Sequence, residues 1–268
     1  MDLQLTGHTA IIVGAARGIG LAIAREFARE GTNLALVDRE PLVAQAQALA
    51  AEFSVRVSVH VGDVTDFASM TKAAADFQRY FSRLDHLVYA VAIGSGKFGF
   101  PFWNLQPSDW PRVMAINVQG AVNVVHAFTP YFIEAKSGTM LLIASVAGQM
   151  GSQTDPPYSA SKAAVINFMQ CAAKDLASYN VRVNALCPGM VKTELNKSIW
   201  AAWNREQAAD KQQSYDDWAG EKIRKVVPLS RWQEPEEMAA MTVFVASERG
   251  KSITGQCLNV DGGFVMHS

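Results

Sequence analysis

The chain has 268 residues, of which 49% are hydrophobic and 18% charged, and its formal net charge is −1 at pH 7. This length and apolar content suit one large α/β domain or two small ones. The near-neutral charge, without a long run of one sign, argues against a nucleic-acid-binding surface. Three widely spaced cysteines indicate a reducing compartment without disulfides, and the five histidines show no metal-ligand spacing, so we expect no metal.

The N-terminal segment contains neither a basic stretch nor a long apolar run, so we expect no signal peptide. No apolar run reaches the roughly 20 residues that a membrane-spanning helix needs. These features predict a cytoplasmic protein with no membrane and no nucleic-acid partner.

Short apolar runs alternate with amphipathic stretches along the chain. In order, the first half predicts strand 8–14, helix 18–30, strand 34–38, helix 41–53, strand 55–63, helix 66–81 and strand 84–92. The second half predicts helix 108–134, strand 139–145, helix 158–178, strand 181–189 and strand 256–263.

The predicted strands are continuous apolar runs, which is typical of strands buried on both faces of a parallel sheet. Their alternation with helices predicts an α/β fold, a doubly wound parallel sheet of about seven strands with helices on both faces. Right-handed crossovers then bring the carboxyl ends of the strands to one edge, where such sheets bind ligands.

A glycine-rich turn, VGAARGIG at residues 13–20, follows the first strand and opens the first helix. Glycines permit a tight turn and let the backbone approach a phosphate, while the free N–H groups of the helix N-terminus face a pyrophosphate. This position between strand and helix is typical of dinucleotide binding. We expect cofactor contacts from Gly14, Arg17, Gly18, Ile19 and Gly20.

Asp38 ends the second strand, about 20 residues after the glycine turn. A carboxylate there accepts hydrogen bonds from the ribose hydroxyls of NAD and repels the 2′-phosphate of NADP. The alternative is that Asp38 caps the next helix, with Pro41 in its first turn. Arg17 and Arg39 are placed to meet a phosphate instead, but we expect NAD because the acid itself occupies the ribose position.

Asp63 and Val64 follow the third strand. A carboxylate at this strand end can accept a hydrogen bond from the adenine amino group, with the backbone of Val64 beside it. The alternative is that Asp63 caps the helix that follows Thr65.

Over nearly its whole length, the chain resembles the classical short-chain dehydrogenase/reductase (SDR) family. The shared motifs are the glycine turn, DV at 63–64, MAINVQG around Asn117, LLIASVAG around Ser145, YSASK at 158–162, NALCPGMVKT and GQCLNVDGG. Ser145 precedes Tyr158 by thirteen residues, the usual family spacing. Each motif is weak alone, but their shared order and spacing are highly specific.

This resemblance implies a single NAD(P)-binding Rossmann-like domain over residues 1–268, usually in a homotetramer or dimer, with a substrate lid at about 193–228. It implies a catalytic tetrad of Asn117, Ser145, Tyr158 and Lys162. It also implies that the nicotinamide end of the cofactor contacts a further set of residues: Tyr158, Lys162, Pro188, Gly189, Val191 and Thr193.

Three positions depart from the family pattern. Val13-Gly14 replaces the common Thr-Gly, Ala144 replaces the first of a serine pair, and Tyr89-Ala90-Val91-Ala92 replaces Asn-Asn-Ala-Gly. The asparagine pair normally braces the sheet and the adenosine pocket. We expect the cofactor contact of the Ala90 backbone to survive, with a different local brace.

Tyr158 and Lys162 lie four residues apart, on one face of a predicted helix. A nearby ammonium favours a phenolate, so Lys162 is expected to lower the pKa of Tyr158 and make it a base near neutral pH. Ser145 is expected to hydrogen-bond the substrate oxygen, and Asn117 to hold a water that links Lys162 to solvent. An ordinary helical pair is the alternative for Tyr158 and Lys162.

The lid segment is predicted to form two helices, whose tryptophans mostly pack the lid onto the body. Candidate pocket residues come from two loops and are polar or aromatic: Ser95, Lys97, Phe98, Phe100, Trp103, Gln149, Gln153 and Thr154. Polar groups among aromatic ones suit a sugar, polyol, sugar acid or small hydroxy acid, with Lys97 or a lid arginine meeting a carboxylate.

The predicted activity is NAD-dependent interconversion of a secondary alcohol and a ketone. The alternatives are an NADPH-dependent 3-oxoacyl-thioester reductase, which Asp38 disfavours, and a catalytically silent NAD-binding regulator, which the intact tetrad disfavours. We expect a homo-oligomer, with tetramer the first choice, in which Phe128, Phe168 and Met169 are candidate contacts.

Overall fold

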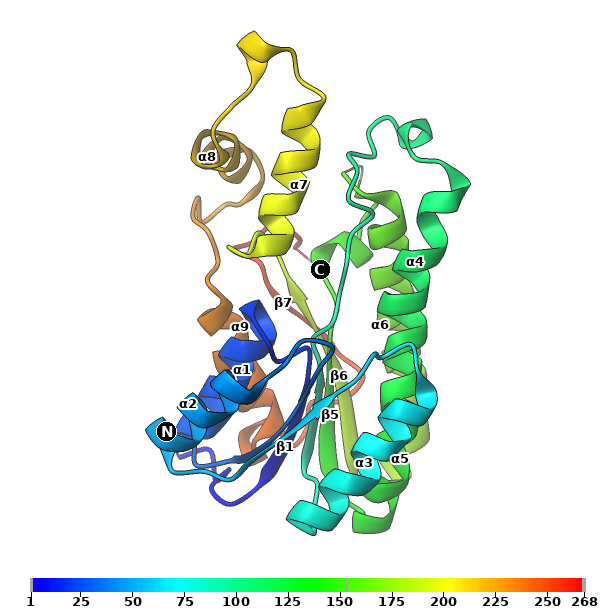
Figure 1. The fold of residues 1–268 in the computed structure, drawn as a ribbon, viewed down its shortest axis with the longest axis vertical. Coiled ribbons are helices and arrows are strands. Elements are labelled where there is room, and N and C mark those ends of the chain that lie inside the picture. Colours follow the sequence, from blue (N-terminus) through cyan, green and yellow to red (C-terminus); the bar gives the residue numbers. More distant parts are fainter. Residues whose placement is uncertain (1, 153, 267–268) are drawn as a thin grey trace.

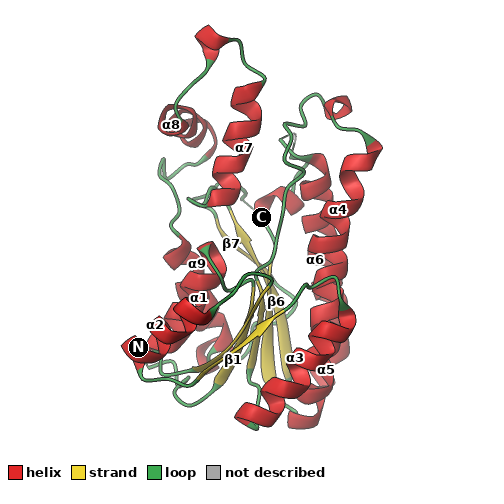
Figure 2. Ribbon diagram, in the orientation of Figure 1, coloured by secondary structure: helices red, strands yellow, loops and turns green. Residues whose placement is uncertain are grey.

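The predicted strands form one parallel sheet in the computed structural model, which describes residues 2–152 and 154–266 (Figures 1 and 2). The seven strands are β1 (Thr9–Val13), β2 (Asn33–Asp38), β3 (Val57–Val61), β4 (His86–Tyr89), β5 (Gly138–Ile143), β6 (Val181–Pro188) and β7 (Cys257–Val260). Their order in the sheet is β3-β2-β1-β4-β5-β6-β7, which confirms the predicted doubly wound topology.

Helices connect the strands and cover both faces of the sheet. They are α1 (Gly18–Arg29), α2 (Val43–Phe53), α3 (Phe67–Phe81), α4 (Trp110–Met114), α5 (Gly120–Ala135), α6 (Pro156–Leu176), α7 (Glu194–Arg205), α8 (Tyr215–Val226) and α9 (Pro235–Ala246). Short 3₁₀ turns lie at Phe102–Asn104, Pro107–Asp109, Val146–Gly148, Ala177–Tyr179, Ala209–Lys211 and Glu248–Gly250.

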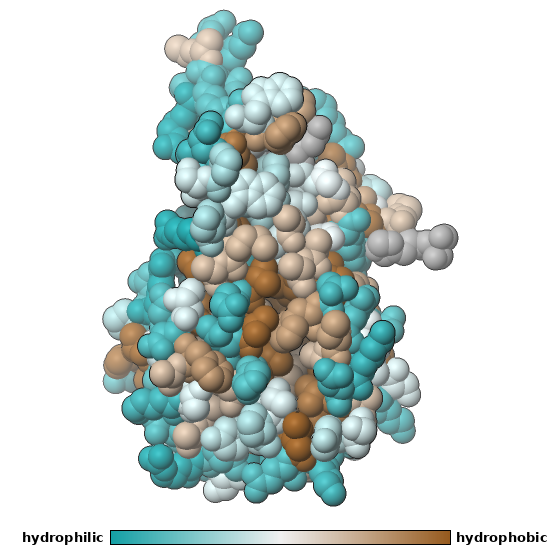
Figure 3. All heavy atoms as spheres, turned by 90° about the vertical axis from the view of Figure 1, so that its right-hand side faces the viewer, coloured by the Kyte–Doolittle hydropathy of each residue, from teal (hydrophilic) through white to brown (hydrophobic). Residues whose placement is uncertain are grey.

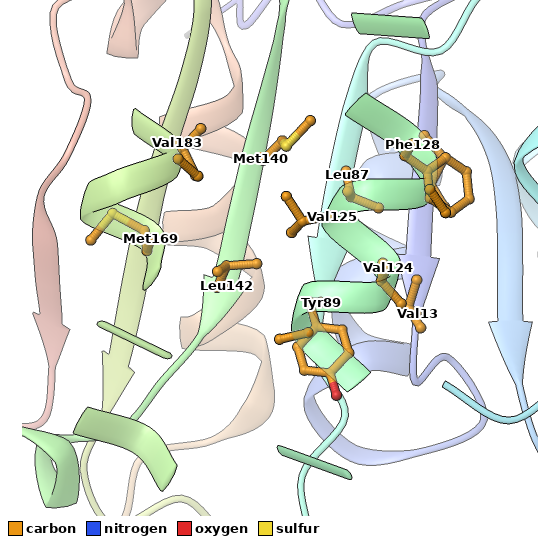
Figure 4. Close-up of a cluster of buried hydrophobic side chains, with 14 of the residues drawn as sticks. Val13, Leu87, Tyr89, Val124, Val125, Phe128, Met140, Leu142, Met169 and Val183 are labelled. Carbon is orange, nitrogen blue, oxygen red and sulfur yellow. The ribbon is translucent and has the colours of Figure 1, made fainter. Parts of the chain in front are cut away.

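Each face of the sheet has its own hydrophobic core. On one face, side chains of α3, α5 and α6 pack on alternate strand residues, as Figure 4 shows for Phe128, Met169 and Leu142. On the other face, α1, α2 and α9 pack on the intervening residues, such as Ile12 and Leu36. This arrangement buries both faces of the central strands and leaves their carboxyl ends free, toward α7 in Figure 1.

The long helix predicted over residues 108–134 is divided in the structure. A π-helical turn at Ala115–Gln119 separates α4 from α5 and contains Asn117. Such wide turns occur mostly as single insertions in α-helices, often at functional sites.

Helix α9 has no counterpart among the helices expected from the sequence. Its residues are apolar on nearly all sides, because it packs against α1 and against β5, β6 and β7, with Met238, Ala239, Val243 and Val245 buried. A helix buried in this way lacks the polar stripe that identifies an amphipathic helix.

Two residues expected at a subunit interface lie inside the monomer instead. Phe128 and Met169 are fully buried in the core that covers α3, α5 and α6. Phe168 is half-buried on α6 and still reaches the surface.

The glycine turn between β1 and α1 depends on close backbone contact. Gly14 has φ +93° and Gly18 has φ +57°, conformations that favour glycine. Gly20 lies inside α1, and a Cβ there would overlap the carbonyl oxygen of Gly14. The first turn of α1 is therefore pressed against the loop that precedes it.

We expect Gly20→Ala to lower the free energy of unfolding by about 1–3 kcal/mol, because the added methyl group forces the turn and the helix apart. Chemical denaturation measures this change. The matched control is Gly220→Ala in α8, where an added Cβ meets only the flexible end of Arg224 at 3.4 Å. That variant is expected to be neutral or stabilised by up to about 1 kcal/mol, and equal effects at the two sites would contradict the prediction.

A histidine pair lies at the opposite edge of the sheet from the ligand-binding edge. His86 is fully buried, and its Nε2 lies 3.0 Å from Nδ1 of His8 while its Nδ1 lies 2.8 Å from Oγ1 of Thr139. Burial, aided by the nearby His8, Arg182 and Arg83, holds the pKa of His86 well below 6.5. His86 therefore stays neutral in the folded protein.

Acidification is expected to weaken the fold below about pH 6.5, because an unfolded His86 binds a proton there and the folded one does not. For one proton the slope approaches about 1.4 kcal/mol per pH unit. Urea denaturation between pH 7.5 and 5.5 should show a shallower loss for His86→Asn than for the unsubstituted protein. His126→Asn, at an exposed position of α5, is the control and should keep the original slope.

Candidate active site

A cavity of about 570 Å³ opens at the carboxyl ends of the central strands. It extends from the glycine turn to helices α6 and α7. Every site residue predicted from the sequence lines it, apart from Asn117: Gly14, Arg17, Gly18, Ile19, Gly20, Asp38, Arg39, Asp63, Val64, Ala90, Ser145, Tyr158, Lys162, Pro188, Gly189, Val191 and Thr193. The topology thus joins segments that lie up to 179 positions apart in the sequence, from Gly14 to Thr193.

The glycine turn and Asp38 form the first end of the cavity. The backbone of Ala16 donates a hydrogen bond to Oδ2 of Asp38 at 2.9 Å, and the backbone of Glu40 donates to Oδ1 at 3.1 Å. Helix α2 begins only at Val43, so Asp38 does not cap it, and the capping alternative is wrong. The carboxylate is held beside the turn, where its remaining lone pairs can accept ribose hydroxyls.

Asp63 also faces the cavity without capping a helix. Its Oδ1 accepts hydrogen bonds from the backbone and the hydroxyl of Thr65, at 2.8 and 2.7 Å, and these bonds lower its pKa. Helix α3 is capped instead by Asp66, which accepts from the backbone of Ser69. Asp63 therefore remains a charged acceptor at the edge of the cavity.

Ser145, Tyr158 and Lys162 come together at the middle of the cavity. Ser145 lies two residues after the end of β5, and the other two lie one turn apart in the first half of α6, whose N-terminus is capped by Asp155. Nζ of Lys162 lies 5.6 Å from the centre of the Tyr158 ring and donates a hydrogen bond to the carbonyl oxygen of Ile143 at 2.6 Å. The lysine is thus fixed beneath the tyrosine.

Burial is the largest influence on the acidity of both groups. It raises the pKa of Tyr158 to about 12, opposed by a hydrogen bond with Ser145, and lowers the pKa of Lys162 to about 8. The lowered tyrosine pKa expected from Lys162 is therefore not produced by the protein's own groups, because desolvation outweighs it. An added positive charge in the cavity would favour the phenolate.

Asn117 lies behind the cavity wall and is fully buried. Its amide accepts a hydrogen bond from the backbone N–H of Ile93 and donates to the carbonyl oxygen of Ile93 and to Oγ of Ser161, each at 2.9 Å. Both side-chain N–H groups thus have protein partners. The side chain therefore braces α6 against the loop after β4, and it is not free to donate to the expected relay water.

Tyr89 provides the brace that replaces the family's asparagine pair. Its hydroxyl donates a hydrogen bond of 2.6 Å to the carbonyl oxygen of Ile116, the residue before Asn117. Gly120 leaves room for this hydroxyl, since a Cβ there would lie 2.7 Å from it. The end of β4 is thereby linked to the π-helical turn.

Most of the predicted pocket residues lie outside the cavity. Lys97 forms an ion pair with Asp109 at 2.9 Å, and Gln149 pairs with Asn259. Phe100 and Trp103 are exposed, while Thr154 does line the cavity. Gln153 lies outside the described residues. Ser95 and Phe98 are also absent from the cavity wall, because the loop after β4 turns away beyond Ile93.

The two predicted lid helices are present as α7 and α8. Their tryptophans form an aromatic cluster with Tyr215, in which Trp203 lies 6.3 Å from Trp218 and Trp200 lies 5.8 Å from Tyr215. These contacts join α7 to α8 within the predicted lid, whereas the tryptophans were expected mostly to pack the lid onto the body. Sequence analysis missed the lid residues that do line the cavity: Glu194, Leu195, Asn196, Ile199 and Lys222.

Residues 2–152 and 154–266 contain no cluster of three or more metal-ligating side chains. Among the same residues, no helix has the length and apolar content to cross a membrane.

Comparisons with known proteins agree with this geometry. A family model described as enoyl-(acyl carrier protein) reductase matches residues 14–265. The 3-oxoacyl-(acyl-carrier-protein) reductase FabG of Thermotoga maritima is 30% identical over 269 residues, covering 98% of this chain and 100% of that protein.

Two solved structures extend the likeness to the whole fold. The L-sorbose reductase of Gluconobacter frateurii, complexed with NADPH and L-sorbose, superposes with a TM-score of 0.90 at 27% identity and 100% coverage of both chains. An NAD⁺-bound xylitol dehydrogenase has a TM-score of 0.87 at 29% identity, with 97% of this chain and 100% of that chain covered. With its family motifs gathered on one cavity, the chain belongs to the short-chain dehydrogenase/reductase family of oxidoreductases, which bind a nicotinamide cofactor and act on CH–OH groups.

Proposed function

We propose that this protein interconverts a secondary alcohol and a ketone with NAD, on a sugar, polyol, sugar acid or small hydroxy acid. The observation that carries the proposal is the meeting of Ser145, Tyr158 and Lys162 on one cavity that also contains the glycine turn and Asp38. A bound nicotinamide supplies the hydride acceptor, and its positive charge when oxidised favours the phenolate form of Tyr158.

In the proposed mechanism each residue acts on a stated atom. Tyr158 takes the proton of the substrate hydroxyl as general base, and Ser145 donates a hydrogen bond to the same oxygen. Lys162 holds the nicotinamide ribose and supplies positive charge near the phenol. Asn117 keeps α6 in register with the loop after β4, through Ser161 and Ile93.

The choice of NAD follows from the electrostatics around Asp38. Its carboxylate is held by two backbone N–H groups at the end of β2, so it cannot swing away from a 2′-phosphate. Arg39 has a side chain 55% exposed, and its nearest acid is Glu40 at 3.9 Å, so it is far less fixed than Asp38. We infer that the repulsion of the 2′-phosphate of NADP by Asp38 outweighs its attraction by Arg39.

The rival activity is NADPH-dependent reduction of a 3-oxoacyl thioester, which the likeness to FabG favours. The resemblance to a sorbose reductase and a xylitol dehydrogenase favours polyhydroxylated substrates. The cavity wall under the lid supports a polyhydroxylated substrate, because it combines polar Asn196 and Lys222 with apolar Ile199. An acyl chain would have no use for these polar groups.

We also propose a cytoplasmic homotetramer. Three free cysteines are compatible with a reducing compartment. A band of apolar atoms runs down the face of the molecule that carries α3, α5 and α6 (Figure 3), and Phe168 is half-buried on this side of the fold. The two other predicted contacts, Phe128 and Met169, are excluded by their burial.

We expect Tyr158→Phe to lower kcat by about a hundredfold or more, because the variant lacks the general base. The assay follows reduction of NAD and NADP with panels of polyols, sugars, sugar acids and hydroxy acids. Cofactor binding, measured by quenching of protein fluorescence, should survive. Retained activity in Tyr158→Phe would contradict the proposed mechanism, and cofactor binding without turnover by the unsubstituted protein would favour the silent regulator.

Asp38→Ser is expected to lower kcat/KM for NAD by about ten- to a hundredfold, since two hydrogen bonds to a charged acceptor are lost. The same change should raise kcat/KM for NADP, because the repulsion of the 2′-phosphate is removed. Glu40→Ser is the control, since Glu40 is an exposed acid two residues away that does not line the cavity. An unsubstituted protein that prefers NADP would overturn the cofactor assignment.

A further inference from the structure

The cavity continues past Ser145 and Tyr158 into a chamber beneath the lid. Its wall there contains Met190 and Phe264 from the body, Leu195, Asn196 and Ile199 from α7, and Lys222 from α8. Helices α7 and α8 lie beyond the carboxyl ends of the strands in Figure 1. A substrate whose reacting carbon sits at Tyr158 would extend its far end into this chamber.

Lys222 is the unusual member of this wall. It lies on the face of α8 that also carries the buried side chains of Trp218, Ala219 and Ile223. Within residues 2–152 and 154–266, no carboxylate lies within ion-pair distance of its ammonium, and its closest aromatic contact is the Trp218 ring at 4.9 Å. Burial lowers the pKa of Lys222, and no acid opposes this effect.

Two other lysines of the lid do have acid partners. Lys225, three residues after Lys222 on α8, forms an ion pair with Glu221. Lys197 on α7 forms an ion pair with Glu194 at 2.9 Å. Glu194 also lines the cavity, but its carboxylate is paired with Lys197 and is not within ion-pair distance of Lys222. Lys222 is therefore a half-buried cation for which the described lid supplies no carboxylate within ion-pair distance.

Asp155, another acid on the cavity wall, has hydrogen-bond partners of its own. Oδ2 of Asp155 accepts a hydrogen bond of 2.7 Å from the backbone of Ser95, while Oδ1 faces the backbone of Tyr158 at the start of α6. Asp38 and Asp63 belong to the opposite, dinucleotide end. A desolvated ammonium without a partner is unfavourable, and an anionic ligand would relieve it.

A second polar group in the chamber has no partner. Oδ1 of Asn196 is buried and makes no hydrogen bond with any described residue. Buried side-chain oxygens are nearly always paired, and Asn196 is a residue of the cavity wall, so a ligand group that reaches this oxygen would supply the missing donor. A hydroxyl group is the simplest donor that such an amide oxygen accepts.

We propose that Lys222 and Asn196 bind the far end of the substrate, and that this end is a carboxylate with a neighbouring hydroxyl. The substrate class is then a polyhydroxy carboxylic acid, oxidised at a secondary alcohol distant from the acid group. One ammonium and one amide on the wall of the same cavity match the single charge of a carboxylate. A phosphate carries a second charge that these two residues leave unmatched. The inference rests on the proposed function, which it narrows.

The test compares aldonates with alditols of the same carbon number. The two pairs are D-gluconate with D-glucitol and D-xylonate with xylitol. D-Glucitol 6-phosphate is added to test a phosphate in place of the carboxylate. The unsubstituted enzyme should prefer the acid in at least one pair. Lys222→Met should lower kcat/KM for that acid by about ten- to a hundredfold, mainly through KM. The ratio of kcat/KM for the acid to kcat/KM for the matching alditol should fall accordingly.

Two further variants separate charge from packing. Lys222→Arg keeps the charge and should retain most of the preference for the acid. Lys225→Met removes an exposed lysine from the same helix and should change nothing. The proposal is overturned if the enzyme prefers the alditol in every pair, if it prefers the phosphate, or if Lys222→Met leaves the ratio of acid to alditol unchanged.

A binding measurement keeps this inference separable from the proposed function. If no compound is turned over, the proposed function fails, and thermal unfolding in D-gluconate then decides about the site. Protection of the unsubstituted protein that is lost in Lys222→Met supports the anion site by itself. Equal protection of both proteins, or of neither, overturns it.

Discussion

The amide of Asn117 is the contact on which the rest of the site depends. Its three hydrogen bonds join the π-helical turn, the loop after β4 and helix α6, and the bond to Ser161 is buried. Because Ser161 lies beside Lys162, the bond to Ser161 fixes the face of α6 that carries Tyr158. A buried network of this kind rigidifies only when every member is satisfied, and the hydrogen-bonding groups of this amide all have partners.

The Tyr89 hydroxyl supports the same turn from the other side and shows how the fold tolerates a departure from the family pattern. Tyr89 and Gly120 act together, because the larger side chain at the end of β4 fits only where residue 120 has no Cβ. The sequence reveals that the asparagine pair is absent, but the compensating glycine lies thirty-one positions away on a different element. Only the packing of β4 against α5 shows that the two positions are related.

Much of the cavity could be predicted because a parallel sheet converts positions in the sequence into positions in space. Glycine, acid and serine motifs each follow a strand, so the topology alone brings Gly14, Asp38 and Ser145 to one edge. Loops obey no such rule. Lys97 was predicted as a pocket residue, but it forms an ion pair with Asp109. Lys222 was not predicted, because the sequence of α8 does not show which of its lysines faces the cavity. Helix α9 was not predicted, because a helix that is buried on nearly all sides shows no periodic polar face in its sequence.

Burial also explains why the catalytic pair cannot be judged from its residues alone. A phenol and an ammonium in the same desolvated place are both pushed toward their neutral forms, which gives the raised pKa of Tyr158 and the lowered pKa of Lys162. In the protein alone, burial therefore disfavours the phenolate form of Tyr158, and further positive charge in the cavity would favour it. The oxidised cofactor brings such a charge, whereas the reduced cofactor does not. The same burial that disfavours the phenolate in the protein alone would therefore tie its formation to the oxidised cofactor, and in the reverse direction it would keep Tyr158 protonated and able to donate.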